Sequence, residues 1–560
     1  MDIAITLGEN YFSFLLVFLL TSFFLFSIAK TTFRSKQNIP PGPWRWPIIG
    51  NMHQVGKDPH VVTAVLAQRH GPLISLHLGT QLLVVAASPE AALEILKTKD
   101  RFTSSRFVPN AFQSYLLPFT LIWSTDCDEN WKSLRTLCRT EMFSSKALES
   151  QSSLRAKKLA QMLDFLCEKK GEVVSIEGVV FTTMFNTLSN IFFGKDFLDL
   201  DDKNGSDGGL REQLFKTLAT GVTPNVSDFF PMLARLDLQG LRTKNLKHVK
   251  GIFNSWERII DERRSMVAVA EGEQCFVDCL LENGFSNDQI SMLGLELFTA
   301  GTDTTTSTVE WAMAELVKNK NVMSKLREEL KNEINTRTVV ESEVSNLPYL
   351  NACIKETLRL HPPAPFLLPH RAYQTCEVMD YTLPRGSQIL VNIWAIGRDP
   401  KLWEDPLLFK PERFLGSNLD FGGQNFEFIP FGAGRRMCPG LQSGVKSVQT
   451  ILASLILRFD WLLPNDDDPV NLDMSEKLSP RLKSGPALSP HSCGPDLIME
   501  SAKCIPPNGP SVMDYSPYLE NGTVHLLGVG GGQLSTPLPT CTKRGCRRLM
   551  GQHRLHEESR

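Results

Sequence analysis

The sequence lacks an excess of charge of either sign. Its 560 residues include 59 Lys and Arg and 61 Asp and Glu, which gives a formal net charge of −2 at pH 7. A nearly neutral chain has no electrostatic reason to bind nucleic acid, and we expect no such partner. The chain also lacks a dense cysteine framework, because its 12 cysteines are scattered. This distribution favours reduced thiols in the cytosol over a disulfide scaffold.

A second absence concerns cofactor-binding motifs. The glycine-rich stretch around Gly530 reads GVGGGQ, which does not match G-x-G-x-x-G and follows no clear βαβ unit. The chain therefore carries no flavin or nicotinamide fingerprint. Its length and 42% hydrophobic content suffice for a large core, in two ordinary domains or one large domain.

One long hydrophobic run is present at the N-terminus. Residues 11–29 carry no charge, and at about 1.5 Å per residue such a helix nearly crosses a hydrocarbon core of about 30 Å. Asp2 and Glu9 precede the run and Lys30 follows it, so the positive-inside rule places the rest of the chain in the cytosol. A cleaved signal peptide is the alternative, disfavoured by the acidic start. We predict a single-pass anchor over residues 1–30.

A proline-rich stretch follows the run. Four prolines and two glycines between Asn38 and Asn51 forbid a continuing helix, so we expect a hinge over residues 31–56. Residues 57 to about 477 contain no linker of similar strength. Most of their segments carry apolar residues at three- and four-residue spacing, with a few short strand-like runs. The sequence predicts one large, mainly α domain with small β-sheets (α+β).

One predicted helix contains residues that disfavour helix. Its start, SNDQ at Ser286, has the spacing of a capping box, and residues 300–308 read AGTDTTTST. Glycine and repeated threonine are poor helix formers, and such contradictions often mark functional sites. The Thr304 hydroxyl can bond the Ala300 carbonyl and bend the helix, which would open a groove beside Asp303. The alternative is a polar helix face with back-bonded threonines.

A single cysteine stands in an unusual setting near the C-terminus. The segment FIPFGAGRRMCPG ends at Gly440 and contains Cys438. Because Pro439 suits the first position of a helix, we place Cys438 at the N-cap, where the helix dipole and backbone N–H groups would lower the pKa of the thiol. Gly432, Gly434 and Gly440 would let the backbone approach a flat group closely. An inert buried cysteine is the alternative.

The absence of a second Cys or His nearby argues against zinc, which usually takes three or four protein ligands. A haem supplies four nitrogens itself and needs one axial residue, and a cysteine thiolate in that position favours O–O cleavage. The segment fits the haem-binding pattern F-x-x-G-x-R-x-C-x-G of the cytochromes P-450, and the chain resembles that family. The matching residues are Phe431, Gly434, Arg436, Cys438 and Gly440.

Four further motifs support the resemblance in the family's order. They are WKSLR from Trp131, AGTDTT from Ala300, ETLR from Glu356 and FKPERF from Phe409. The resemblance covers about residues 30–477 and is similar to plant microsomal alkaloid and terpenoid hydroxylases, of the N-methylcoclaurine 3′-hydroxylase-like and geraniol hydroxylase-like kinds. It implies the cytochrome P-450 fold with an N-terminal transmembrane helix, and a haem-thiolate catalytic domain over residues 57–488.

The resemblance also implies roles for individual residues. Glu356 and Arg359 share a helix face and would form, with Arg413, a buried ion-pair network behind the haem. Phe431 would screen the sulfur from water. Because guanidinium groups match carboxylates, the residues expected at the haem propionates are Trp131, Arg135, Arg371 and Arg436, with a surface salt bridge as the alternative for Arg371.

The implied reaction is insertion of one oxygen atom of O2 into a hydrophobic plant secondary metabolite, such as a benzylisoquinoline alkaloid or a terpenoid. The cofactor would be haem b with Cys438 as axial ligand, and Asp303 and Thr304 would relay protons. Electrons would come from NADPH through NADPH–cytochrome P-450 reductase at the endoplasmic reticulum membrane. Lys132 and Arg139 are candidates for its docking face, with solvated surface charge as the default. Phenol coupling or rearrangement is the rival chemistry.

The sequence gives less information about the substrate pocket. By family analogy it is lined by residues 107–122, 222–233, 295–304 and 364–368, which are largely apolar with scattered hydroxyl groups. This composition suits a hydrophobic or aromatic substrate. Core packing explains each stretch equally well.

The resemblance ends near Leu478. Where the family continues with a short β-hairpin that reaches the substrate, SPRLKSGPALSP keeps only a trace of it. Residues 489–560 are rich in Gly, Pro and Ser without periodicity, and we predict a disordered tail that resembles translated intron or frameshifted sequence. A second departure is GLQSGVKSVQ after the cysteine, where the family usually has GLPLA. A second function class is therefore a product without turnover, disabled by its C-terminus.

Overall fold

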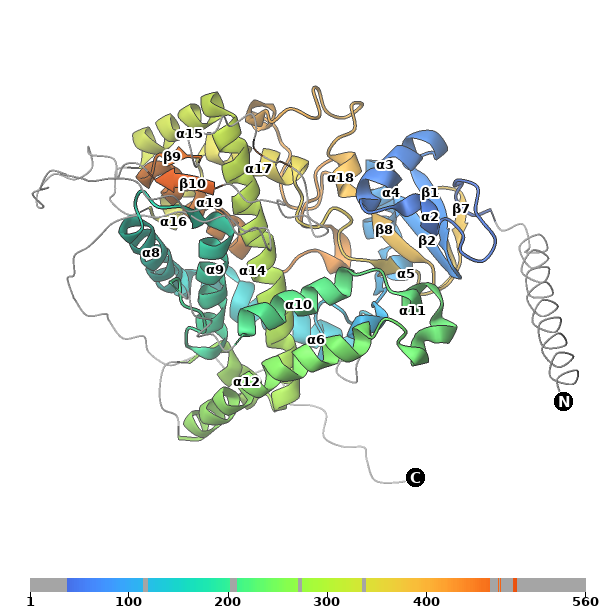
Figure 1. Ribbon diagram of the computed structural model, residues 1–560, viewed down its shortest axis with the longest axis horizontal. Coiled ribbons are helices and arrows are strands. Elements are labelled where there is room, and N and C mark those ends of the chain that lie inside the picture. Colours follow the sequence, from blue (N-terminus) through green and yellow to red (C-terminus); the bar gives the residue numbers. More distant parts are fainter. Residues whose placement is uncertain are drawn as a thin grey trace, which may run out of the picture.

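The computed structural model describes residues 38–113, 119–201, 209–269, 274–334, 339–463, 472, 474 and 487–490 (Figure 1). The predicted anchor and the first part of the predicted hinge lie outside the described residues, as does the tail after residue 490. Among the helices that are described, none combines the length and the apolar character needed to cross a membrane.

Helices dominate the described chain, as the sequence predicts. The long helix α14 (Asn287–Lys318) runs through the middle of the molecule and packs along α9 (Ile176–Phe193) (Figure 1). The other helices are α2 (Met52–Val55), α3 (Pro59–His70), α4 (Pro89–Leu93), α5 (Asp100–Thr103), α6 (Glu129–Cys138), α7 (Ser145–Ser150), α8 (Ser152–Glu168), α10 (Leu210–Val222), α11 (Val226–Phe229), α12 (Leu241–Val269), α13 (Phe276–Glu282), α15 (Lys320–Glu333), α16 (Glu341–Val344), α17 (Pro348–Leu360), α18 (Ile393–Ile396) and α19 (Leu441–Arg458).

Three small sheets accompany the helices. The largest has the strand order β1 (Leu73–Leu78), β2 (Gln81–Ala86), β8 (Gln388–Val391), β5 (His370–Arg371) and β3 (Ser105–Arg106). The second has the order β4 (Val174–Ser175), β10 (Ala487–Pro490) and β9 (Trp461–Leu462), and the third pairs β6 (Cys376–Val378) with β7 (Tyr381–Leu383). Only β2 and β8 are parallel among these described pairs.

Helix α14 forms despite its poor helix formers because most of its length is buried. Its start is the predicted capping box, in which Ser286 accepts from the N–H of Gln289 and the Gln289 side chain accepts from the N–H of Ser286. An aromatic cluster packs on its first half, where Phe298 makes T-shaped contacts with Phe192 and Trp256, each at a centroid distance of 5.3 Å. The helix is continuous from Asn287 to Lys318, so the predicted bend does not interrupt it.

Two predictions about the C-terminal part need correction. The helix after the cysteine begins at Leu441 with Gly440 at its N-cap, so Cys438 is not the N-cap residue that Pro439 led us to expect. Strand β10 also crosses the predicted domain boundary at residue 488, since Ser489 and Pro490 pair with β9. The strand ties the end of the described chain to β4 and β9.

Candidate functional site

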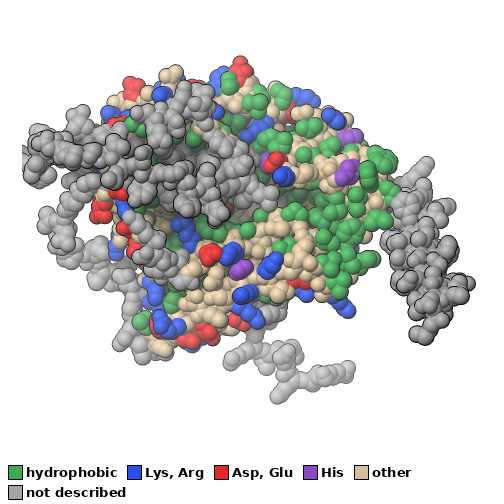
Figure 2. Space-filling model, in the orientation of Figure 1, with side chains coloured by type: hydrophobic (Ala, Val, Ile, Leu, Met, Phe, Trp, Pro, Cys, Tyr) green, Lys and Arg blue, Asp and Glu red, His purple; other side chains and the backbone are tan. Residues whose placement is uncertain are grey.

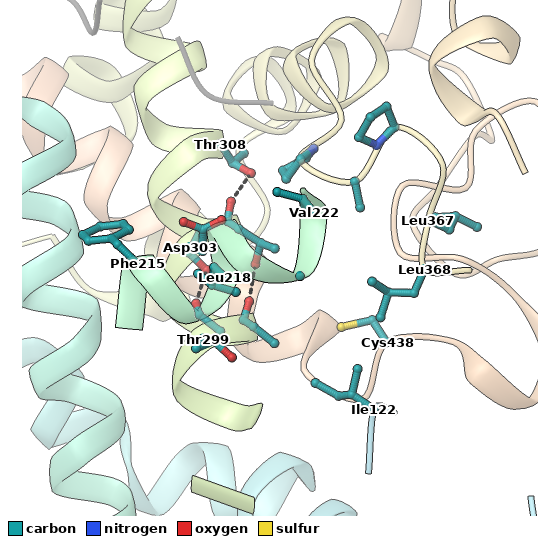
Figure 3. A pocket seen from close by; sticks show the side chains of 18 of the residues that line it. Ile122, Phe215, Leu218, Val222, Thr299, Asp303, Thr308, Leu367, Leu368 and Cys438 are labelled. Carbon is teal, nitrogen blue, oxygen red and sulfur yellow. Dashed lines mark hydrogen bonds between the residues drawn. The ribbon is translucent and has the colours of Figure 1, made fainter. Parts of the chain in front are cut away.

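A cavity of about 2350 Å³ lies in the middle of the molecule, with Cys438 in its wall. All four predicted stretches contribute to its lining, although the described residues after Phe229 in the second stretch do not. One face of α10 contributes Phe215, Leu218 and Val222 at helical spacing, and Figure 3 shows Val222 nearer the Cys438 sulfur and Phe215 farther from it. The chamber is largely apolar.

The sulfur of Cys438 points into this chamber, toward α14 (Figure 3). Its backbone N–H donates to the carbonyl of Phe431 at 3.0 Å, which fixes the loop. Burial raises the pKa of the thiol, while the N–H of Gly440 and the charge of Arg135 act in the opposite direction. The expected lowering of this pKa is therefore wrong for the protein atoms alone, because burial in the middle of the molecule outweighs the helix start.

The glycines around Cys438 are needed for different structural reasons. Gly434 has a φ of +67°, and a Cβ there would lie 1.9 Å from the carbonyl oxygen of Leu96, so the turn demands glycine. At Gly440 a Cβ would meet only ordinary contacts, at 3.9 Å from the sulfur and 3.7 Å from Phe143. The protein itself thus leaves room at Gly440 beside the sulfur, as close approach of a flat group would need.

Buried arginines gather on one side of the chamber. Arg436 and Arg135 both lie over the ring of Trp131, with their guanidinium carbons 4.6 and 5.3 Å from its centroid. Arg436 donates to the carbonyls of Ser104 at 2.9 Å and Ser124 at 2.7 Å, and its remaining nitrogen Nη1 is buried with no partner among the described atoms. The indole N–H of Trp131 already donates to a backbone carbonyl at 2.8 Å, so this residue offers the arginines its ring face.

Sequence reasoning missed two residues of this cluster. Arg106 and His370 face each other as register partners in β3 and β5, both are buried, and both line the cavity. Arg371, which we predicted, lies next in the strand with an exposed side chain and does not line the cavity. Alternation along a strand puts neighbours on opposite faces, so His370, and not Arg371, faces the cavity. Arg106 could have been predicted only from the pairing of β3 with β5, and this pairing is not apparent from the sequence.

The arginine cluster lacks enough negative charge of its own. Burial and the charge of Arg436 lower the pKa of Arg106 to about 9, and burial with the charge of Arg106 lowers that of His370 to about 3. Burial likewise lowers the pKa values of Arg135 and Arg436. Three neighbouring cations, of which Arg106 and Arg436 are buried and Arg135 is half-buried, destabilise one another and call for an anionic ligand.

The wall of α14 opposite the sulfur carries the predicted polar residues. Thr304 donates its hydroxyl proton to the carbonyl of Ala300 at 2.7 Å, as predicted, and Thr308 donates to the carbonyl of Thr304 at 2.8 Å. Both Ala300 and Thr304 are exposed to the cavity, and Asp303 lines it beside them (Figure 3). Because each hydroxyl proton is held by a carbonyl, the lone pairs of these threonines are left to accept hydrogen bonds from the chamber.

The predicted ion-pair network lies outside the chamber. Arg359 donates to both carboxylate oxygens of Glu356, at 2.7 and 2.8 Å, and Arg413 donates to the same carboxylate at 3.1 Å. Glu356 also accepts from the backbone N–H of Lys410 at 2.8 Å, while the remaining arginine donors reach carbonyls such as that of Pro406. The side chains of Glu356 and Arg359 are fully buried.

Comparison with known proteins agrees with this geometry. The family model described as Cytochrome P-450 matches residues 40–485. The chain belongs to the cytochrome P-450 family. It is 45% identical to (S)-N-methylcoclaurine 3′-hydroxylase isozyme 1 of Eschscholzia californica over 81% of this chain and 93% of the relative. It is also 45% identical to corytuberine synthase of Coptis japonica (81% and 93%) and 39% identical to geraniol 8-hydroxylase of Catharanthus roseus (82% and 94%).

Membership in this family makes the protein a haem-thiolate oxidoreductase of the monooxygenase class. The site of this cytochrome P-450 fits a haem on three observations. Cys438 is the cysteine among the described lining residues, the buried arginines need an anion such as two propionates, and Arg436 has an orphaned donor. A bound cation also favours the thiolate form of a ligating cysteine.

One buried carboxylate of this cytochrome P-450 escaped the sequence reasoning. Glu296 of α14 accepts three backbone hydrogen bonds, from Leu121 at 2.6 Å and from Ile122 and Trp123 at 3.1 Å each. Burial raises its pKa to about 7, against those hydrogen bonds and the charge of Arg436. It anchors the loop that forms one side of the chamber. A glutamate inside an otherwise apolar helical stretch was the available signal.

Proposed function

We propose that this cytochrome P-450 inserts one oxygen atom of O2 into a hydrophobic plant secondary metabolite, of the benzylisoquinoline-alkaloid or terpenoid class. The observation that carries the proposal is the Cys438 sulfur, which points across an apolar chamber toward α14 (Figure 3), the helix whose residues Asp303 and Thr304 line that chamber. The names of the relatives support both substrate classes, and the alkaloid class has the higher identity.

The residues of the chain take distinct roles in this proposal. Haem, when bound, supplies the iron that binds and activates O2. Cys438 would hold the iron, and Arg106, Arg135 and Arg436 would hold the propionates by hydrogen bonds and charge, with the neutral His370 packed beside them.

On the opposite wall, the Thr304 oxygen accepts a hydrogen bond from the reacting group while its hydroxyl proton is donated to the Ala300 carbonyl. Asp303 holds and passes protons from the cavity, which is a contribution of about 10²–10⁴-fold for a positioned acid–base group. The apolar residues of α10 and of the loop 363–369 exclude water and orient the substrate.

We propose that electrons come from NADPH through NADPH–cytochrome P-450 reductase at the endoplasmic reticulum membrane. The lack of a flavin or nicotinamide fingerprint supports an external donor, and Lys132 and Arg139 on the surface of α6 and the turn after it are candidate contacts. Exposed apolar side chains support attachment to a membrane, and Figure 2 shows hydrophobic side chains gathered on the side of the molecule where α2 and α11 lie. They include Trp44, Trp46, Ile48, Met232, Leu236 and Leu238.

Phenol coupling is the second candidate function, favoured by the likeness to corytuberine synthase. A product without turnover is the third class. Against it stands β10, which pairs with β4 and β9 and so joins the altered C-terminal segment to the fold as far as Pro490.

The test reconstitutes the full chain with the reductase, NADPH and a panel of N-methylated benzylisoquinolines and monoterpenols. A reduced-CO difference spectrum first establishes the thiolate-ligated haem. Mass spectrometry then separates the two chemistries, because hydroxylation adds one oxygen atom and coupling removes two hydrogen atoms. A normal CO spectrum without oxidation of any panel member would contradict the proposed substrate classes, and absence of the haem band would support the inactive product.

A further inference from the structure

Gly221 lies near the end of α10, and a neighbouring residue outside this helix leaves no room for a side chain at its position. Its backbone is helical, so alanine would suit the helix better than glycine. However, a Cβ at this position would lie 2.0 Å from Cζ and 2.3 Å from Cε2 of Phe112. The ring of Phe112 therefore occupies the notch that the glycine leaves.

The Phe112 ring is one half of an aromatic pair. It lies 5.1 Å from Trp123 between ring centroids at an interplanar angle of 44°. Both residues line the cavity and are partly exposed to it. The neighbouring residues Ile122 and Val222 surround the space in front of the Cys438 sulfur (Figure 3). The pair is thus a wall of the same chamber.

Three helices hold this wall in place. The carbonyl of Ala111 accepts from the buried side chain of Asn245 on α12 at 2.7 Å. The N–H of Asn110 donates to Asp228 on α11 at 2.6 Å. On the other side, the N–H of Trp123 donates to Glu296 on α14 at 3.1 Å. With the backbone anchored on both sides of the pair, a Cβ at position 221 would displace the Phe112 ring and leave the loop in place.

We infer that Phe112 and Trp123, seated against Gly221, form a fixed aromatic subsite that receives a planar aromatic ring of the substrate, with Gly221 as its positioning residue. The inference rests on the proposed function and selects aromatic substrates over aliphatic ones such as monoterpenols. A third aromatic ring can pack against the pair in an edge-to-face or offset arrangement. Such an arrangement contributes binding free energy in addition to that of the buried surface. Rigid placement matters because an ordered wall loses little entropy on binding.

The experiment measures binding of two imidazoles to the full-chain haem protein by the shift of its Soret band. 4-Phenylimidazole and 4-cyclohexylimidazole share the coordinating nitrogen and differ in the planar ring. We expect the wild type to favour the phenyl compound by about 3- to 10-fold in Kd. Gly221→Ala and Phe112→Leu should each bring this ratio close to one.

The control is Gly178→Ala on α9, a cavity-lining helical glycine whose Cβ would meet nothing closer than 3.4 Å, and it should keep the wild-type ratio. Phe112→Leu decides the matter if Gly221→Ala fails to retain haem, because it removes the ring without adding volume to the notch. A preference for the phenyl compound that survives Phe112→Leu would overturn the subsite. Equal Kd values for the wild type with a normal CO spectrum would overturn it as well, while leaving the haem-thiolate assignment intact.

Discussion

Replacing Glu296 with glutamine changes the charge of a buried group while keeping its shape. The pKa of Glu296 is about 7 in the fold, against 4.5 in an unfolded chain. A pKa that is raised by folding stabilises the protein at low pH, and this stabilisation is lost as the pH rises toward the folded value. At about 1.4 kcal/mol per pH unit, the wild type loses about 3 kcal/mol between pH 4.5 and pH 7 through this group.

Glutamine removes the titration but introduces a constant penalty. Its oxygen can still accept from Ile122 and Trp123, whereas its amide nitrogen faces the N–H of Leu121. One unsatisfied buried N–H costs about 1–3 kcal/mol at any pH. The free energy of unfolding of the wild type minus that of Glu296→Gln should therefore fall by about 2 kcal/mol between pH 5.5 and pH 8.

Urea unfolding of both haem proteins, followed by tryptophan fluorescence across this pH range, measures the difference. Glu282→Gln, at an exposed carboxyl at the end of α13, serves as the control and should show no such trend. A difference that stays level with pH would refute the reasoning. A level difference would show that the three N–H donors and Arg436 outweigh burial, because a folded pKa at or below 4.5 leaves the carboxylate ionised throughout this pH range.

Four further outcomes are expected. Cys438→Ser should abolish the reduced-CO band of thiolate-ligated haem, and a normal band would remove Cys438 as the axial ligand. Thr304→Ala should keep haem and substrate binding but lower the product formed per NADPH consumed, because the chamber loses a hydroxyl that accepts a hydrogen bond; unchanged coupling would exclude the proton-relay role. Arg359→Ala should lower the free energy of unfolding by about 3–5 kcal/mol because it leaves the Glu356 carboxylate buried without its main partner, and a loss below 1 kcal/mol would contradict the network. Deletion of residues 491–560 should leave the haem content unchanged, whereas deletion from residue 487 removes β10 and should lower it; equal effects would show that β10 is dispensable.

The sequence predicts those parts of the site that lie close together along the chain. The loop around Cys438 and the ion pair between Glu356 and Arg359 could be predicted because the residues that interact in them are only a few positions apart in the sequence. Arg106 and His370 could not, because they meet through the register of two-residue strands that are far apart in the chain. The same difference explains why the sequence did not show that His370, rather than Arg371, faces the cavity.

Energetic quantities were harder to predict than positions. The pKa of Cys438 depends on burial, which outweighs the helix start that the sequence displays. We expected α19 to start at Pro439, but it starts at Leu441 with Gly440 as its N-cap residue. Proline is compatible with the first position of a helix but does not by itself start one. The hydrogen bond from Thr304 to Ala300 was predictable because it follows from the four-residue period of the helix alone.

The arginine cluster has a consequence for biosynthesis. Its members come from β3, α6, β5 and the loop before α19, so the cradle is complete only after residue 436 has left the ribosome. Until then, the anion-binding site lacks Arg436. Once Arg436 is present, the mutual repulsion of Arg106, Arg135 and Arg436 opposes closure, and a dianionic ligand relieves it. Haem should therefore act as a folding ligand that enters late and draws the N-terminal and C-terminal parts of the chain together, with stability rising with its free concentration.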